Sequence, residues 1–386
     1  MYCWIDMMRY LVLILTLVLA VSCGHDSETT SSLKDAGVLN IYVYPADDPM
    51  VTRGDEGLIS AKVLENAVKS LKIWIFKHAG SADTDLPLHY LAPAEPELQG
   101  MQGSRAKLFQ IALTEEQVKA ITGDGNQVDV YVLTNAESIG LGTLNGSSKR
   151  SEVRDAVIVS GYFGTTSLTT DISAAGLPMA GCAENISVQG SYPVLSLPVV
   201  KLTRCVSKIR FVMAQNKDVD AKFSITSIQL HGNQFPETEH VFNTTANPYY
   251  ISDGYVTDPV SITPPAVAKT ERIFDLVYKS QQIQDYEDIL DKFVADGEVS
   301  QLGPYYFRES DKRLSGTIGY SIKENNLVYD KTVNFQMNEV PGNYNFSRNH
   351  SWIVYVYYLG GEELRMLQVY IRSWEEAERE RDLFNW

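Results

Sequence analysis

The side chains that most often carry out catalysis are scattered along this chain and form no recognisable motif. The 6 histidines include no HxxxH pair, and the 4 cysteines include no CxxC. A GxSxG nucleophile motif and a glycine-rich phosphate loop are also absent. The sequence therefore predicts a protein that is not an enzyme, with no catalytic residues, no metal site and no cofactor.

Two short motifs could carry other chemistry. Asp83-Thr84-Asp85 offers two carboxylates to a calcium ion, but the fuller spacing of an EF-hand loop is missing, so we favour a solvated loop. Arg53-Gly54-Asp55 spells the RGD tripeptide that integrins recognise. Three residues recur by chance too often to support that function. Arg53 matters more as a residue that a trypsin-like protease could cut after.

The N-terminal residues predict export and lipidation. Arg9 precedes an apolar run from Tyr10 to Val21, which is the layout of a signal peptide and is shorter than the about 20 residues of a membrane span. Cys23 follows the small residue Ser22 and resembles the acylated cysteine of the bacterial lipobox, although Ala20 stands where leucine is usual. The alternative is an ordinary signal peptide with a chance cysteine.

Charge and cysteine content limit the partners further. The net charge is −15, spread along the chain without a basic patch, so nucleic acid is not an expected partner. Beyond the N-terminal segment the chain has two cysteines, Cys182 and Cys205. In an exported protein these could form a disulfide, and the alternative is two buried free thiols.

The elements that position these residues are predicted to be mostly β-strands. Short alternating segments, rich in β-branched and aromatic residues, are typical of an all-β sandwich. Examples are Leu71–Phe76, Lys107–Leu113, Gln127–Thr134, Lys208–Ala214 and Phe223–Gly232. Gly360 and Gly361 separate two alternating runs and predict a hairpin. Short helices are expected at Lys62–Ser70, Thr114–Ile121 and Asp285–Gly297.

The first strand is followed within a few residues by Arg53. In Val38–Pro45, Leu39, Ile41 and Val43 share one face, which suits a half-buried place in a sheet. Cutting after Arg53 would separate this strand from the rest of the chain. Its departure would leave an unpaired sheet edge and an apolar groove, which another strand could fill. The alternative is a permanent first strand.

Several sequence blocks follow one another in a characteristic order. The first is VTRGDEG followed by LENAVKSLKIWIF, the second is VVKLTRCVSKIRF, and YYFRES comes next. NFSRNHSWIVYVYYLGG with LQVYIRSW closes the series. In this order the blocks resemble the fimbrillins, the type V pilins of Bacteroidales, although Cys205 stands where a small residue is more usual in that family. The resemblance covers nearly the whole chain.

The resemblance implies an all-β fold of two transthyretin-like β-sandwich domains with a few short helices. It implies a lipoprotein signal peptide at 1–22, acylation of Cys23 and a propeptide with the removable first strand at 23–53. An N-terminal domain at 54–200 and a C-terminal domain at 201–386 would follow. Cleavage between Arg53 and Gly54 by a trypsin-like protease would release Leu39, Ile41 and Val43 as a plug strand, so that a donor strand could replace it.

The implied protein is a subunit of a fimbria, anchored in the outer membrane by its lipid and exposed at the cell surface. Its partners would be other fimbrial subunits and a host or bacterial surface ligand. The tail after Trp374 reads EEAERERDLFNW, a poor alternating strand, so either the donor lies partly within LRMLQVYIRSW or the subunit sits at an end of the fibre. Alternatives are a non-polymerising anchor or tip subunit, a glycan-binding surface lipoprotein and a surface hydrolase.

Overall fold

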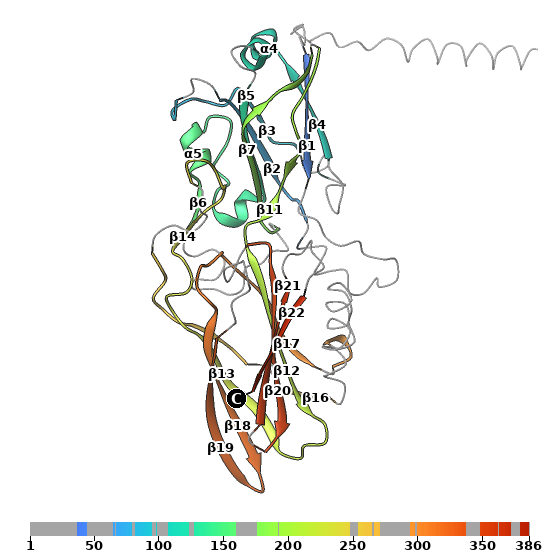
Figure 1. Cartoon of the computed structure of the whole chain (residues 1–386), viewed down its shortest axis with the longest axis vertical. Helices are drawn as coiled ribbons and strands as arrows, with labels where there is room; N and C mark the ends of the chain where they lie inside the picture. Colours follow the sequence, from blue (N-terminus) through green and yellow to red (C-terminus); the bar gives the residue numbers. More distant parts are fainter. Residues whose placement is uncertain are drawn as a thin grey trace, which may run out of the picture.

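The structure is a computed structural model, and the all-β fold predicted from the sequence is confirmed. It describes residues 37–44, 65, 67–78, 82–94, 98, 107–122, 127–159, 176–191, 193–247, 254–264, 266–270, 294–297, 299–336, 348–361, 363–371 and 379–385. Helical elements are short: α4 at Glu115–Thr122, α5 at Arg150–Arg154 and the 3-10 turn η1 at Ala136–Ile139. Figure 1 shows two groups of strands, one above the other along the longest axis.

The upper group is a sandwich of two sheets, called here the N-terminal sandwich. One sheet has the order β10-β1-β9-β8 with β4 paired to β1, and the other has the order β11-β7-β5-β2-β3. The strands of the first sheet are β1 Gly37–Tyr44, β4 Lys107–Leu113, β8 Gln189–Ser191, β9 Val194–Ser196 and β10 Val200–Lys201. Those of the second are β2 Leu71–Lys77, β3 His89–Leu91, β5 Gln127–Thr134, β7 Met179–Ser187 and β11 Thr203–Arg204.

The lower group is the C-terminal sandwich. Its larger sheet has the order β16-β12-β20-β21-β22 with β17 paired to β12, and its smaller sheet has the order β15-β13-β18-β19. The larger sheet contains β12 Ser207–Asn216, β16 Ala268–Thr270, β17 Ser300–Phe307, β20 Ser351–Gly360, β21 Glu363–Ile371 and β22 Arg379–Asn385. The smaller contains β13 Lys222–Leu230, β15 Val260–Ile262, β18 Ser315–Glu324 and β19 Leu327–Gln336.

Alternation of apolar residues explains both sandwiches. In β4, for example, Phe109, Ile111 and Leu113 are buried, while the residues between them are exposed. Such faces from the two N-terminal sheets meet in one apolar cluster, and faces from the two C-terminal sheets meet in another. The predicted hairpin is β20–β21, where Gly360 and Gly361 take positive φ angles of 112° and 62°.

The chain crosses from one sandwich to the other between Arg204, the last residue of β11, and Ser207, the first of β12. The expected boundary at 201 falls within β10, because Lys201 still pairs with β1. A two-stranded sheet also joins the sandwiches, formed by β6 Val157–Val159 and β14 Thr238–His240. Beside it a third apolar cluster combines Tyr131 of β5 with Phe242 and Tyr306.

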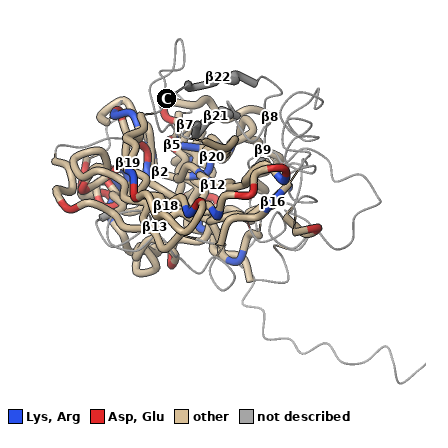
Figure 2. Tube along the Cα trace, turned by 90° about the horizontal axis from the view of Figure 1, so that it is seen from below, with Lys and Arg blue, Asp and Glu red and all other residues tan. Residues whose placement is uncertain are grey.

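Charged side chains are buried at this junction. Glu65 accepts a hydrogen bond from Tyr306 Oη at 2.8 Å and lies 3.1 Å from Lys208 Nζ, and the Lys208 side chain is fully buried. Arg348 forms ion pairs with Glu239 and with Glu309. Elsewhere along the described trace, Lys and Arg alternate with Asp and Glu without a patch of one sign, as Figure 2 shows from below.

Two local expectations are corrected. The tail after Trp374, expected to be a poor strand, forms β22 at the edge of the larger sheet and pairs with β21 from Arg379 to Asn385. An edge strand is held mainly by backbone hydrogen bonds, which do not require apolar side chains. Charged side chains on such a strand also oppose aggregation with other chains, so a charged sequence is compatible with this position. The helix expected up to Ser70 is absent at Ala67–Ser70, because Asn135 binds these backbone groups instead.

Candidate functional site in the N-terminal sandwich

The first strand, β1, is an interior strand of its sheet. On one side it pairs antiparallel with β4 from Gly37 to Val43, all but its last residue. On the other side it runs parallel to β9 at Val38–Asn40 and to β10 at Val43–Tyr44. The prediction that Val38–Tyr44 pairs in the N-terminal sheet is confirmed.

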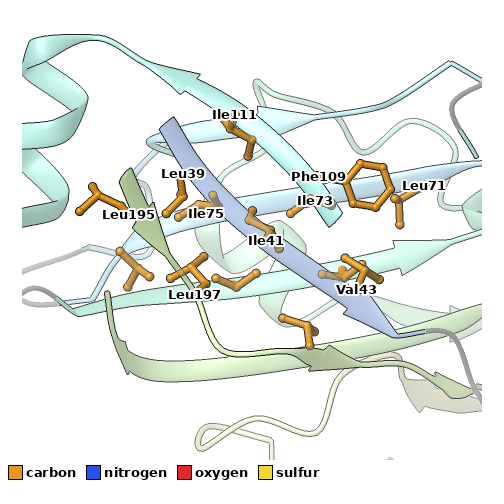
Figure 3. Close-up of a cluster of buried hydrophobic side chains, with 14 of the residues drawn as sticks. Leu39, Ile41, Val43, Leu71, Ile73, Ile75, Phe109, Ile111, Leu195 and Leu197 are labelled. Carbon is orange, nitrogen blue, oxygen red and sulfur yellow. The ribbon is translucent and has the colours of Figure 1, made fainter. Parts of the chain in front are cut away.

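The inward face of β1 is the apolar one that the sequence predicts. Leu39, Ile41 and Val43 are each 0% exposed and lie in the N-terminal cluster. Figure 3 shows them beneath the strand, between side chains of β2, β4 and the segment around β9, including Ile73, Phe109 and Leu195. Burial of side chains of this size stabilises a fold by about 1.5–3 kcal/mol each.

The outward face of β1 is polar or partly exposed. The Asn40 side-chain oxygen accepts a hydrogen bond from Gln110 Nε2 at 3.2 Å, across the pair with β4. Tyr42 lies opposite Leu108, and these two side chains are 37% and 39% exposed. The inward face therefore supplies most of the hydrophobic attachment of the strand.

Departure of β1 would open a slot rather than a single edge. β4 would lose its partner on one side of the slot, and β9 and β10 would lose theirs on the other. Two unpaired edges and the exposed side chains of the cluster would then face each other across the space of one strand. A replacement strand that reproduces the ladders of β1 runs antiparallel to β4 and parallel to β9, and presents apolar side chains at three alternate positions.

The start of the slot is narrow. A Cβ atom at Gly37 would lie 3.1 Å from Pro193 O and 3.3 Å from Val118 Cγ2, closer than ordinary contact. Pro193 O also accepts a hydrogen bond from Val38 N at 2.8 Å, which holds that carbonyl in place. A strand that fills the whole slot therefore needs a small residue at this position, two residues before its first inward apolar side chain.

The residues just before β2, Ala67–Ser70, are fastened independently of β1. Asn135, which is fully buried, accepts hydrogen bonds from Lys69 N at 2.8 Å and Ser70 N at 3.3 Å. It donates to Ala67 O at 2.8 Å and to Leu177 O at 2.6 Å. No sequence motif marks Asn135, because its partners come from distant parts of the chain.

The structure places some of the predicted site residues and leaves others untested. The lipidation residue Cys23 and the processing residues Arg53 and Gly54 lie outside the described residues. Asp83 forms an ion pair with Arg154 at 2.6 Å. The Asp85 carboxylate accepts a hydrogen bond from Ala82 N of the same loop at 2.7 Å. Within the described part of the chain, no group of three or more His, Cys, Asp or Glu residues could hold a metal ion.

The disulfide alternative is corrected, because Cys182 and Cys205 are free thiols. Cys205 N donates to Pro178 O, so Cys205 is level with the residue that precedes β7. Cys182 lies in β7, four residues beyond Pro178, and four residues of a β-strand span about 13 Å. A disulfide needs Cα atoms within about 7 Å. Burial also raises the pKa of both thiols to about 12.

No protein-family model matches the chain, and no curated protein matches it. Solved structures do. A candidate cell adhesion protein of Parabacteroides distasonis is 12% identical with a TM-score of 0.50, over 92% of this chain and 98% of that one. Another, from Bacteroides eggerthii, is 12% identical with a TM-score of 0.45, over 91% and 95%. A fimbrial protein of Bacteroides ovatus is 11% identical with a TM-score of 0.25, over 85% and 52%.

These likenesses concern the fold. At 12% identity, the Parabacteroides protein shares the chain's all-β architecture over nearly the full length of both molecules. In the parts that the structure describes, no helix is both long and apolar enough to cross a membrane.

Proposed function

We propose that this chain is a structural or adhesive subunit of a cell-surface fimbria. It is exported as a lipoprotein through Cys23, cleaved after Arg53 and polymerised by exchange of β1 for a donor strand. The observation that carries the proposal is the position of β1: an interior strand with a fully buried apolar face, connected to the rest of the sandwich through the segment that contains Arg53. The adhesion neighbour from Parabacteroides supports a role at the cell surface.

Cleavage changes how β1 is held without changing its contacts. Before the cut, β1 is tethered to its own slot at an effective concentration that short linkers place in the millimolar range. After the cut, only the ladder bonds and the inward face hold it. A donor strand can then enter as β1 leaves, so that the two edges and the cluster are never exposed together.

One segment of this chain has the pattern that the slot requires. Leu39–Val43 reads LNIYV, and Leu367–Ile371 in β21 reads LQVYI, with apolar, amide and tyrosine residues at matching positions. Arg365 stands where Gly37 stands in β1, and there even a Cβ atom would lie only 3.1 Å from Pro193 O. A donor of this sequence from another copy would fill the slot from Leu39 onwards and leave the end beside Pro193 empty.

The proposal is tested by comparing wild type, Arg53→Ala and Arg53→Lys after treatment with a trypsin-like protease. Arg53→Ala should fold normally, because surface substitutions usually change stability by less than about 0.5 kcal/mol, and should give no SDS-resistant ladder. Arg53→Lys keeps a cation for the protease and should behave as wild type. Ladders of equal intensity from Arg53→Ala would rule out activation at this residue.

The N-terminal residue of protein sheared from cells separates a stalk subunit from an anchor. Gly54 is expected for a processed and polymerised subunit. Acylated Cys23 would identify an anchor subunit that keeps β1 permanently.

A further inference from the structure

β12 and β20 lie side by side in the C-terminal sandwich and run parallel. Their register joins eight residue pairs, from Lys208 with Ser351 to Gln215 with Tyr358. β12 begins where the chain leaves the N-terminal sandwich, and β20 ends at Gly360, where the chain turns into β21. Because the strands are parallel, the entrance to β12 and the exit from β20 lie at opposite ends of the pair.

This arrangement decides how the pair responds to tension. Figure 1 shows both strands along the long axis, with the N-terminal sandwich beyond the start of β12. A pull between the two ends of the molecule draws β12 one way and β20 the other, so the strands must slide past each other. All ladder bonds are then loaded at once, whereas strands peeled from one end lose their bonds one at a time.

The side chains of both strands resist the same movement. Ile209, Phe211 and Met213 of β12 and Trp352, Val354, Val356 and Tyr358 of β20 are buried in the C-terminal cluster. Tyr358 stacks on Phe223 of β13, with ring centroids 4.6 Å apart. Close-packed side chains cannot slide without opening voids, so the facing sheet opposes the motion as well.

The end nearest the N-terminal sandwich has additional fastenings. Lys208 N donates to His350 O at 2.8 Å, and Asn349 N donates to Val206 O at 2.9 Å. The Lys208 ammonium also reaches Glu65, on the segment that leads to β2. Force that arrives from the N-terminal sandwich therefore reaches β12 along the backbone and through this buried ion pair.

We propose that the β12–β20 pair is a mechanical clamp that makes this protein a load-bearing unit. Its use in a fibre rests on the proposed function, but the clamp is a property of the single chain. A donor strand that contained β21 would leave from the exit of β20, so tension between subunits would cross the same pair. Resistance to forced unfolding is set by the contacts broken at the unfolding barrier, and here those are the contacts of this pair.

Single-molecule pulling on the full chain tests the clamp. Azide-bearing residues at Val199, which is 56% exposed, and at Glu363, the first residue of β21, load the pair in shear. Handles at Lys312 and Gln336 instead pull from the open end of the β18–β19 hairpin, whose last pair is Ser315 with Gln336. The first geometry should need several times the rupture force of the second.

Two matched variants separate the clamp from general stability. Val356→Ala removes the same atoms from β20 that Val260→Ala removes from β15, in the same cluster. Both should lower the free energy of unfolding, but only Val356→Ala should lower the shear rupture force. Equal forces in the two geometries, or an equal loss of force in the two variants, would overturn the clamp.

The outcome is independent of polymerisation. A high shear rupture force in a chain that forms no ladder after cleavage would support the mechanical clamp and refute the proposed polymerisation. Ladders from a chain that ruptures at equal force in both pulling geometries would support the proposed polymerisation and refute the mechanical clamp.

Discussion

Glu239 and Glu309 share one guanidinium, that of Arg348, at the junction between the sandwiches. Glu239 is fully buried, and burial raises its pKa to about 7, with the neighbouring Glu309 charge adding to the effect and Arg348 opposing it. Burial raises the pKa of Glu309 as well. The folded protein therefore holds protons here that the unfolded chain releases near pH 4.5.

We expect the stability of the protein to fall between pH 5 and pH 8. In this window the raised pKa of Glu239 makes the folded state bind more protons than the unfolded state, so unfolding becomes easier as pH rises. Urea denaturation at several pH values measures this fall in stability.

Glu239→Gln is the control for this pH dependence. The amide cannot titrate, so the slope of stability against pH should become shallower in the variant. A slope equal to that of wild type would show that other groups cause the dependence.

At the scale of elements, β1 combines strong burial with attachment through a single chain connection. Ile41→Ala should lower the free energy of unfolding of the uncleaved protein by about 2–5 kcal/mol, because it leaves a cavity under an interior strand. In a cleaved sample the same change should speed ladder formation, since the plug is held less firmly.

Tyr42→Ser tests the opposite face of the same strand. Tyr42 is 37% exposed, so its replacement should affect stability less than Ile41→Ala and should leave the exchange rate close to that of wild type. If Ile41→Ala leaves the rate of ladder formation unchanged, exit of β1 is not the step that limits exchange.

At the scale of the whole molecule, the two sandwiches are coupled through the Glu65–Lys208 pair. Glu65→Gln would leave a buried ammonium without its carboxylate, which typically costs about 3–5 kcal/mol. We also expect the two sandwiches of this variant to unfold in separate transitions, because the pair links the segment before β2 to the first strand of the C-terminal sandwich. Calorimetry and chemical denaturation measure both effects.

An exposed ion pair supplies the matched control. Glu115 and Lys119 lie one turn apart on α4, 2.7 Å apart, with side chains 74% and 71% exposed. Glu115→Gln should change stability only slightly, because solvent screens an exposed ion pair. If Glu65→Gln costs no more than this, the junction is held by its apolar cluster and not by the buried pair.

The sequence alone determined the features that depend on neighbours in the chain. Alternation identified Leu39, Ile41 and Val43 as one face of a strand, and two glycines identified the β20–β21 turn, because side-chain direction and turn geometry are local properties. The all-β class followed from many such segments.

Tertiary structure decided what each strand pairs with. β9 and β10 flank β1 from more than a hundred residues away, which turned the expected sheet edge into a slot with two walls. Pairing with β21 made a strand of a charged tail, and register kept Cys182 and Cys205 too far apart to bond. The contacts of Asn135 with Ala67–Ser70 and of Glu65 with Lys208 likewise join residues far apart in sequence. The physical reason is that pairing and register depend on contacts between residues far apart in sequence, which the pattern of a single segment does not encode.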